Sequence, residues 1–255
     1  MKTKRLKEME ELILRQGSVS MEELREHFGV SMNTVRRDAA SLVRKGQVEK
    51  VYGGLRAVST PSLLVPYEER LARPDSAKRA ICAAAAEMVH EGDIIFIDSG
   101  TTTVHLMNML KDRRITVITN NIDVMMLALE HANIRLIVVP GELRRDTHSI
   151  TGEASASFLS QFNTHMAFMA ATGVSSNGDV TNSSPLEHAI KREAVAHTER
   201  AVLMVTSGKF DVTSLLTYAN LKNFQQVITD SQITPAWREK LAEMKLDTVV
   251  VPAGD

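Results

Sequence analysis

A turn rich in hydroxyl groups is the strongest local signal for chemistry in this sequence of 255 residues. It follows the apolar run DIIFID (93–98), precedes a helical stretch, and consists of Ser99, Gly100, Thr101, Thr102 and Thr103. A helix N-terminus presents unpaired backbone N–H groups and a partial positive charge, and glycine permits a close approach of the backbone. The turn therefore predicts a phosphate-binding cradle, with an ordinary capped strand-to-helix turn as the alternative.

Other polar residues stand where further apolar runs end. They are Asp98, Asn120, Asn121, Gly141, Glu142, Gly173 and Lys209. In an open parallel sheet, ligands bind at the carboxyl ends of the strands. We therefore expect these residues to converge on one crevice with the hydroxyl-rich turn. Glu187 and Lys191, four residues apart on a predicted helix, belong to the same crevice or form a surface salt bridge.

The elements that must position these residues are short apolar, β-branched runs that alternate with helical stretches. Seven such runs occupy residues 93–98, 114–119, 134–140, 165–172, 201–206, 225–229 and 247–252. Near-continuous apolar strands between helices are typical of a parallel sheet that is covered on both faces. The body of the chain is therefore predicted to be an α/β domain with a mostly parallel sheet.

The first 58 residues have a different pattern, which predicts three helices and a β-hairpin. Ser20 and Glu23 form a capping box that begins the second helix at Met21, and Ser31 begins the third. The stretch that follows alternates around Gly53-Gly54, which is a hairpin signal. Three helices and a hairpin in this order predict a winged helix-turn-helix.

The third helix carries the residues expected to contact DNA. With Val35, Ala39 and Leu42 facing inward, its outer face presents Ser31, Met32, Asn33, Thr34, Arg36 and Arg37. Arginine reads guanine and asparagine reads adenine from the start of a recognition helix. The end of the helix and the wing add Lys45, Lys50, Tyr52 and Arg56 as phosphate contacts. For the arginine pair alone, a solvated charged face is an equal alternative.

Charge and composition agree with this division. Residues 1–58 hold 12 basic and 8 acidic side chains, a net +4, whereas residues 59–255 hold 18 and 23, a net −5. A basic head on an acidic body favours a polyanionic partner. The single cysteine excludes an intrachain disulfide, and no apolar run approaches the ~20 residues of a membrane span. These features predict a cytoplasmic protein with no membrane partner.

The stretch 59–74 contains Pro61, Pro66 and Pro74, and it is the predicted linker. The expected domains are therefore a DNA-binding domain at 1–58 and a larger domain at 75–255. The eight histidines are scattered without metal-ligand spacing, so neither a metal nor another cofactor is expected.

The head resembles the DeoR-type bacterial transcription regulators. The resemblance rests on Arg5, Met9, Ile13, the run SMNTVRRD (31–38) and VYGG (51–54). Ala39 departs from the larger apolar residue that is usual in the family. Asp38 is unexpected on a DNA surface, and it is either an ion-pair partner that orients a nearby Arg or Lys or a plain exposed acid.

The resemblance continues through the body, in DSGTTT, Asn120-Asn121, the Gly141 loop, Glu187 with Lys191-Arg192, and Lys209-Phe210. It implies a sensor domain similar in fold to ribose-5-phosphate isomerase and glucosamine-6-phosphate deaminase. It also implies a phosphorylated sugar or related metabolite as effector. Thr206 stands where the family commonly has an acid, which implies an altered effector preference or a weakened pocket.

These observations together predict a DNA-binding repressor of a sugar-utilisation operon, released from its operator by a phosphorylated sugar. A dimer or tetramer is expected, because one head makes few DNA contacts. One alternative is an activator with a different effector. Another is a sugar-phosphate isomerase-type enzyme with Asp98 or Glu142 as the base, but no second acid–base partner is identifiable, and a non-enzyme is predicted.

Overall fold

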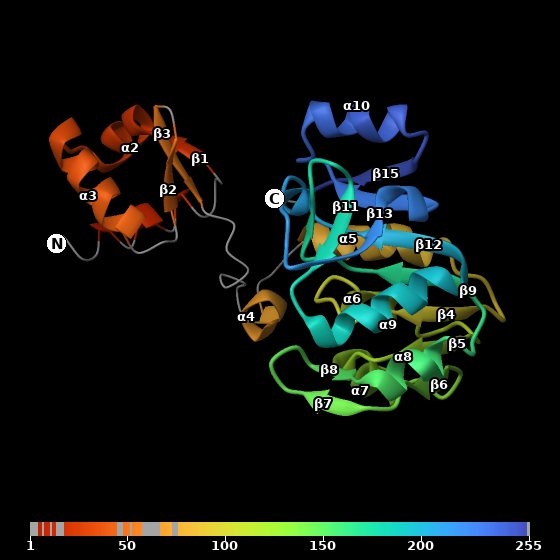
Figure 1. Ribbon diagram of the computed structural model, residues 1–255. Helices are drawn as coiled ribbons and strands as arrows, with labels where there is room; N and C mark the ends of the chain where they lie inside the picture. The colour runs from red at the N-terminus through yellow and green to blue at the C-terminus, as the bar shows by residue number, and fades with distance from the viewer. Residues whose placement is uncertain are drawn as a thin grey trace. The chain divides into compact units, whose positions relative to one another are not determined.

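The computed structural model describes residues 5–6, 8–10, 12–13, 18–44, 48–51, 53–57, 67–72 and 76–253. The chain divides into two compact units, Met1–Leu63 and Leu64–Asp255. Helix α4 (Tyr67–Ala72) falls inside the stretch 59–74 that was predicted to be linker, yet it belongs to the larger unit (Figure 1). The physical reason is that Tyr67 is buried there and its hydroxyl donates a hydrogen bond to Asp123.

The smaller unit has the predicted winged helix-turn-helix architecture (Figure 1). The described residues between 5 and 13 are helical, and α2 (Met21–Phe28) and α3 (Met32–Arg44) follow. Strands β2 (Val48–Val51) and β3 (Gly54–Ala57) form the wing hairpin. A third strand, β1 (Ser18–Ser20), pairs antiparallel with β3, and its three residues were too few to predict from alternation.

Local sequence signals explain how these helices begin and end. The Ser20 hydroxyl accepts from the backbone N–H of Glu23, and the Glu23 carboxylate accepts from the backbone N–H of Ser20, which confirms the capping box. Gly29 ends α2 in the left-handed conformation, at φ 59°. The predicted inward positions Val35, Ala39 and Leu42 are all buried. The apolar spacing therefore fixes which face of α3 is left for a partner.

The larger unit is built on a seven-stranded sheet in which every pair of neighbouring strands is parallel. Each strand falls on one of the seven predicted runs. They are β4 (Ile94–Ile97), β5 (Thr116–Thr119), β6 (Arg135–Val138), β9 (Thr164–Met169), β12 (Thr198–Met204), β14 (Gln226–Asp230) and β15 (Asp247–Val251). Their spatial order is β15-β14-β12-β9-β4-β5-β6.

Helices cover both faces of this sheet, as predicted (Figure 1). Side chains of α5 (Ser76–Ala86), α6 (Val104–Met109) and α7 (Ile122–Ala128) contribute to one apolar cluster. Those of α8 (Glu153–Leu159), α9 (Pro185–Ala196) and α10 (Pro235–Glu243) contribute to the other. Successive residues of β4 point to opposite faces of the sheet, so Ile95 belongs to one cluster and Phe96 to the other. Burial on both faces is why the strands read as continuous apolar runs.

The order of the strands creates a switch point between β4 and β9. From β4 the chain proceeds to β5 and β6 on one side, and it then returns to β9 and proceeds to β12, β14 and β15 on the other. Two smaller sheets complete the unit. They are the hairpin β7 (Glu142–Arg144) with β8 (Ser149–Thr151), and the antiparallel β10 (Gly173–Val174), β11 (Asp179–Asn182) and β13 (Leu216–Asn220). A ligand site is expected at the switch point.

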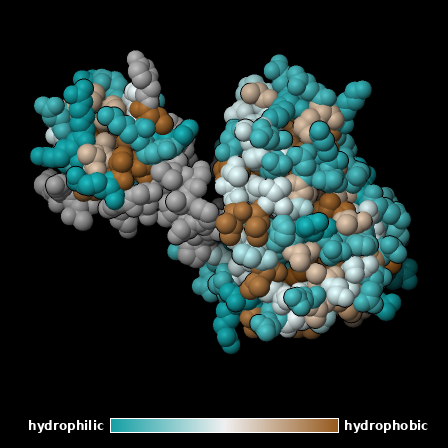
Figure 2. Space-filling model, in the orientation of Figure 1, coloured by the Kyte–Doolittle hydropathy of each residue, from teal (hydrophilic) through white to brown (hydrophobic). Residues whose placement is uncertain are grey.

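The visible surface of each unit is mostly hydrophilic, with isolated apolar residues (Figure 2). None of the helices in the described part of the chain combines the length and the apolar character needed to cross a bilayer.

Candidate nucleic-acid interface and effector site

The first turns of α3 expose a set of polar side chains on the smaller unit. Asn33, Arg36 and Arg37 are exposed, while Met32 and Thr34 are half-buried. The Ser31 hydroxyl accepts from the backbone N–H of Thr34 at 3.3 Å, which caps the helix. Ser31 therefore has a structural role at the N-terminus of α3, and the three exposed polar side chains are the ones available to base edges.

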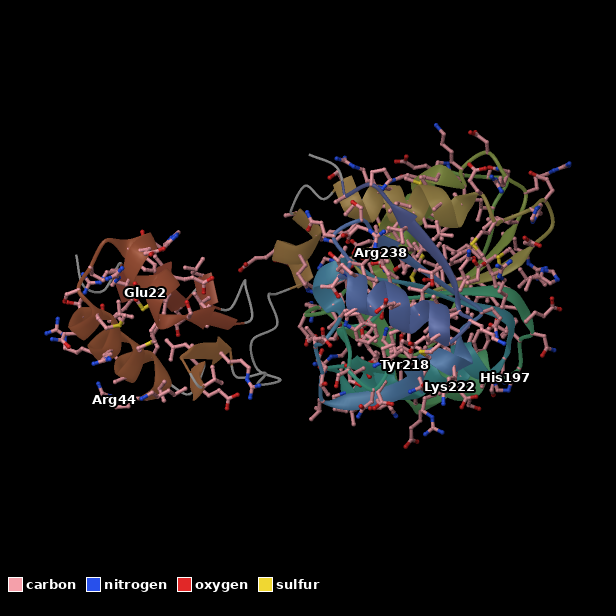
Figure 3. The ribbon with its side chains drawn as sticks, turned by 90° about the horizontal axis from the view of Figure 1, so that it is seen from above. Glu22, Arg44, His197, Tyr218, Lys222 and Arg238 are labelled. Atoms are coloured by element: carbon pink, nitrogen blue, oxygen red, sulfur yellow. The ribbon has the colours of Figure 1, made fainter. Side chains whose placement is uncertain are left out.

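In the described part of the wing, one exposed cation is available for a phosphate. Lys50 on β2 is exposed. Arg56 on β3 is also exposed, but it forms an ion pair with Glu49 across the hairpin at 2.5 Å. Lys45 and Tyr52, the other two predicted wing contacts, lie outside the described residues. Arg44, which the sequence did not single out, extends from the end of α3 at the outer edge of the unit (Figure 3).

Asp38 is neither exposed nor on the DNA face. Its side chain has no exposed surface, and it pairs with Arg5 at 2.8 Å. Arg5 comes from the N-terminal helical residues, so this pair ties them to α3. The ion-pair interpretation was right, and its partner is the Arg5 that also carried the family resemblance.

In the larger unit, a polar cavity of about 260 Å³ opens at the carboxyl ends of β4 and β9. Seven of the predicted effector residues line it. They are Ser99, Gly100, Thr101, Thr102, Glu187, Lys191 and Lys209. The cavity therefore forms at the switch point of the sheet, where an open parallel sheet binds ligands.

Asp98 does not line the cavity, but its hydrogen bonds position residues that do. Its carboxylate accepts hydrogen bonds from the backbone N–H of Ala170, at 2.9 Å, and from the Lys191 ammonium. Lys191 also donates to the Ala170 carbonyl, to which the Tyr218 hydroxyl donates at 2.9 Å. Lys191 is thus in a buried ion pair with Asp98, and the surface salt bridge with Glu187 does not form. Burial raises the pKa of Tyr218 well above its usual value.

Glu187 faces the cavity from α9 with a carboxylate that already accepts two hydrogen bonds. The hydroxyls of Ser99 and Ser149 each donate to its Oε1 atom at 3.0 Å. Burial raises the pKa of this carboxyl, and the Lys191 charge opposes the shift. A carboxylate at such a wall is suited to accept hydrogen bonds from the hydroxyls of a polyol.

Three cations gather around the same cavity. Lys209 on η1 (Ser207–Lys209) is joined by Arg70 of α4 and Lys78 of α5. Burial lowers the pKa of Lys209 to about 8, and the positive charges of Arg70 and Lys78 add to the effect. No acidic side chain pairs with Lys209 in the described part of the chain. A buried ammonium that is flanked by two like charges favours a bound anion.

Sequence reasoning missed Arg70 and Lys78. Arg70 lies within the predicted linker. Lys78 lies on an alanine-rich helix and belongs to no motif that indicates ligand binding. Sequence reasoning also missed the lining residues Tyr67, Thr147 and Asn182. The buried Oδ1 of Asn182 has no hydrogen-bond partner in the described residues. Thr206, noted for its departure from the family pattern, does line the cavity.

The remaining predicted effector residues do not line the cavity. Asn121 caps α7 by accepting from the backbone N–H of Asp123, and Asn120 donates to the carbonyl of Ile150. Thr103, Gly141, Glu142 and Gly173 likewise lie outside the lining. Their backbone and side-chain contacts serve the local fold, as where the Thr103 hydroxyl donates to the Asp98 carbonyl at 2.6 Å.

Across the ranges that the structure describes, no three His, Cys, Asp or Glu residues are arranged to hold a metal ion.

Cys82 is buried, donates to the Thr102 carbonyl, and has a pKa that burial raises.

Two family models match the chain. The DeoR-like helix-turn-helix domain matches residues 5–61, and the DeoR C terminal sensor domain matches residues 74–231. Among solved structures, RipA from Yersinia pestis gives a TM-score of 0.44 at 12% identity over 68% of this chain and 52% of its own. A D-ribose-5-phosphate isomerase in complex with phospho-erythronic acid gives 0.40 at 14% over 68% and 67%. These scores are too low to support a functional argument.

Curated relatives are similar over most of the chain. The HTH-type transcriptional regulator IolR of Bacillus subtilis (strain 168) is 36% identical over 96% of this chain and 98% of its own length. The glycerol-3-phosphate regulon repressor of Escherichia coli (strain K12) is 31% identical over 87% and 88%. The L-fucose operon activator of Haemophilus influenzae is 28% identical over 88% and 92%. Together with the two domain matches, these relatives show that the chain belongs to the DeoR family of DNA-binding transcription regulators.

Proposed function

We propose that this regulator represses a sugar-utilisation operon and is released from its operator by a phosphorylated sugar or a related metabolite. Asn33, Arg36 and Arg37 read base edges, and Lys50 holds a backbone phosphate. The side chains that line the cavity bind the effector. Because its operator is chromosomal DNA, the protein acts in the cytoplasm.

One observation carries the effector assignment: four cations line one cavity, and one of them, Lys209, has no acidic partner among the described residues. The charged side chains that line the cavity or pair with its lining comprise four cations and two carboxylates. The cations are Arg70, Lys78, Lys191 and Lys209, and the carboxylates are Glu187 and Asp98. The formal excess of about +2 matches the dianion of a phosphate monoester at neutral pH. The hydroxyl-rich turn and the Glu187 carboxylate then supply partners for the phosphoryl oxygens and the sugar hydroxyls.

Repression is favoured by the relatives named as repressors of the glycerol-3-phosphate regulon, the lactose phosphotransferase system and the aga operon. The relative named as an activator of the L-fucose operon supports activation as the second candidate. The sign of regulation depends on where the operator lies relative to the promoter. We further propose a dimer or tetramer, because two heads on two half-sites supply the contacts that one head lacks.

The test is the fluorescence anisotropy of labelled DNA taken from upstream of the operon that neighbours the gene. Protein is titrated at fixed salt, because phosphate contacts make the affinity strongly salt-dependent. A panel of sugar phosphates is added to the complex, with the matching unphosphorylated sugars as controls. A Lys209→Met variant, which keeps most of the side-chain length without the charge, is run beside the wild type.

We expect tight binding to this DNA, and release by one sugar phosphate but not by its parent sugar. The Lys209→Met variant should bind DNA equally well and need at least about tenfold more sugar phosphate for release, the equivalent of one lost charge-assisted contact. DNA binding that no phosphorylated compound changes contradicts the effector assignment. Release by an unphosphorylated sugar contradicts the anion role of the cavity.

A further inference from the structure

The effector cavity takes two lining residues, Tyr67 and Arg70, from a helix that lies outside both matched domains. Helix α4 stands between residue 61, where the first match ends, and residue 74, where the second begins. We propose that a bound anion clamps α4 onto the sensor unit through Arg70, and that this docking transmits occupancy of the cavity to the segment leading to the DNA-binding unit. The inference rests on the proposed function, since it requires an anion in the cavity.

Both ends of α4 are fastened to the sensor unit by buried polar contacts. At its start, the Tyr67 hydroxyl donates to Asp123 Oδ2 at 2.7 Å, and the Tyr67 ring lies 4.8 Å from that of His148. Near its end, the Lys78 ammonium donates to the Arg70 carbonyl at 2.7 Å. Asp123 belongs to α7 and Lys78 to α5, so α4 is held by two different elements of the body.

Charge makes this docking sensitive to an anion. Docked α4 brings the Arg70 guanidinium close enough to Lys209 for its charge to depress the pKa of that ammonium. Like charges at a partly desolvated site repel, so the Lys209 and Lys78 charges oppose the docked position of the Arg70 guanidinium, whereas the Glu187 carboxylate attracts it. A phosphate between Arg70 and Lys209 turns this repulsion into attraction, and a guanidinium can hold two phosphate oxygens at once.

The consequence is a linked equilibrium. An anion that binds the docked state better than the undocked state shifts the population towards docking. The coupling is reciprocal, so a change that loosens α4 must weaken anion binding by the same factor. Helix α4 is the first described element beyond the boundary at residues 63 and 64, so a change in its docking acts at the start of the described part of the sensor unit.

Hydrogen–deuterium exchange of the full chain tests the clamp, with inorganic phosphate as the probe. Phosphate binding is followed independently by the ³¹P line width. We expect phosphate to slow exchange of the amides in residues 67–72 by at least about threefold, through stabilisation of the docked state by the ligand. Arg70→Gln should abolish this slowing. Arg79→Gln, on the exposed side of α5, is the matched control and should retain it.

A second variant, Asp123→Ala, tests the reciprocal effect from outside the cavity. Asp123 does not line the cavity, and its loss removes the partner of the Tyr67 hydroxyl. Simple electrostatics predicts tighter phosphate binding when a nearby negative charge is removed. The clamp predicts weaker binding, by at least about threefold, because docking is looser.

The outcomes separate the clamp from the effector site. Phosphate that broadens the ³¹P line but leaves exchange in residues 67–72 unchanged overturns the clamp, and the anion site stands. The clamp is also overturned, and the anion site stands, if phosphate still slows exchange in residues 67–72 of the Arg70→Gln variant or if Asp123→Ala tightens phosphate binding. Absence of ³¹P broadening with the wild-type protein overturns the anion site itself and the clamp with it.

Discussion

Asp98 and Lys191 form a buried ion pair that joins the end of β4 to the middle of α9, across 93 positions of the chain. The same Asp98 carboxylate accepts from the backbone N–H of Ala170 at the end of β9. One side chain therefore fixes the relative positions of the two strands that flank the switch point and of the helix that carries Glu187. The rigidity of the effector cavity depends on this carboxylate.

Asp98→Asn should destabilise the protein strongly. The substitution keeps an acceptor for the Ala170 amide but leaves the Lys191 ammonium buried without its counter-charge. Removing one partner of a buried pair costs about 3–5 kcal/mol. Urea denaturation followed by circular dichroism measures the loss in free energy of unfolding.

The matched control is Asp247→Asn, which breaks the exposed pair between Asp247 and Arg200. Exposed pairs contribute about 0.2–1 kcal/mol, so this variant should remain close to the wild type. The double variant D98N/K191M should recover part of the loss, because the Lys191 ammonium no longer lies buried without the Asp98 carboxylate. Equal losses for Asp98→Asn and Asp247→Asn would show that the buried pair has no special role.

Gly100→Ala should also destabilise the larger unit, by about 1–3 kcal/mol, as overpacking does. A Cβ atom at position 100 would lie 2.2 Å from the Cβ of Ala170. The next nearest atom, the Thr103 hydroxyl oxygen, would be at 3.4 Å. Gly100 is therefore required by the close approach of the hydroxyl-rich turn to β9, in addition to any approach of a phosphate.

The compensating change is Ala170→Gly, which removes the atom that clashes. The double variant G100A/A170G should be more stable than the sum of the two single losses predicts, by at least about 1 kcal/mol in a double-mutant cycle. Additive losses would indicate that the cost arises from the conformation of the turn at Gly100 and not from its contact with Ala170.

The fold was predictable from the sequence where burial produces a regular pattern of apolar residues. All seven strands of the parallel sheet and the capping box at Ser20 follow from local residue types. Two elements were not predicted from the sequence, for physical reasons. Strand β1 has three residues, too few for alternation to register. Helix α4 is six residues long and lies between prolines, and tertiary contacts, those of Tyr67 with Asp123 and of Lys78 with the Arg70 carbonyl, show that it belongs to the body.

The candidate site was predictable only in part. The turn at Ser99 and the position of Lys209 followed from the rule that ligands bind at strand ends, whereas Glu187 was singled out by its spacing from Lys191 on one helix. Arg70 and Lys78 follow no strand, and they reach the cavity because α4 and α5 pack beside it. Conversely, Asn121 follows a strand but caps α7, a role that the sequence alone cannot distinguish from ligand contact. Long-range packing decides both cases.

On the smaller unit, Arg36→Ala and Arg37→Ala test the DNA face of α3. If either arginine contacts a base, its loss should weaken operator binding by about 1–3 kcal/mol and relax the preference at one base pair. Lys50→Ala should weaken binding almost equally for all sequences and lower the salt slope by about 1, as expected for one phosphate contact. Anisotropy titrations at several salt concentrations, with operator and scrambled DNA, measure both effects.

Arg238→Ala provides the control for these variants. Arg238 is an exposed arginine of the larger unit (Figure 3), so its loss changes the net charge equally without altering the DNA face. It should bind operator DNA as the wild type does. If neither α3 variant differs from Arg238→Ala, the recognition surface lies elsewhere on the smaller unit.

Phosphate binding should depend on pH, because burial and the charges of Arg70 and Lys78 lower the pKa of Lys209 to about 8. A bound phosphate favours the ammonium form and raises that pKa, so binding above pH 8 requires the uptake of a proton. Phosphate is already a dianion there, since its second pKa lies near neutrality. Phosphate affinity should therefore fall by about tenfold per pH unit above pH 8, and it should also fall below neutrality, where the dianion takes up a proton. Titrations followed by ³¹P line width over this range measure the profile.

Lys209→Met separates this titration from other groups. The variant should bind phosphate more weakly at pH 7, and its affinity should change little as pH rises through 8, because the proton acceptor is gone. Lys222→Met, at an exposed lysine of the same unit, should keep the wild-type profile. A Lys209→Met profile as steep as that of the wild type would assign the titration to another cation of the cavity and remove Lys209 from the anion site.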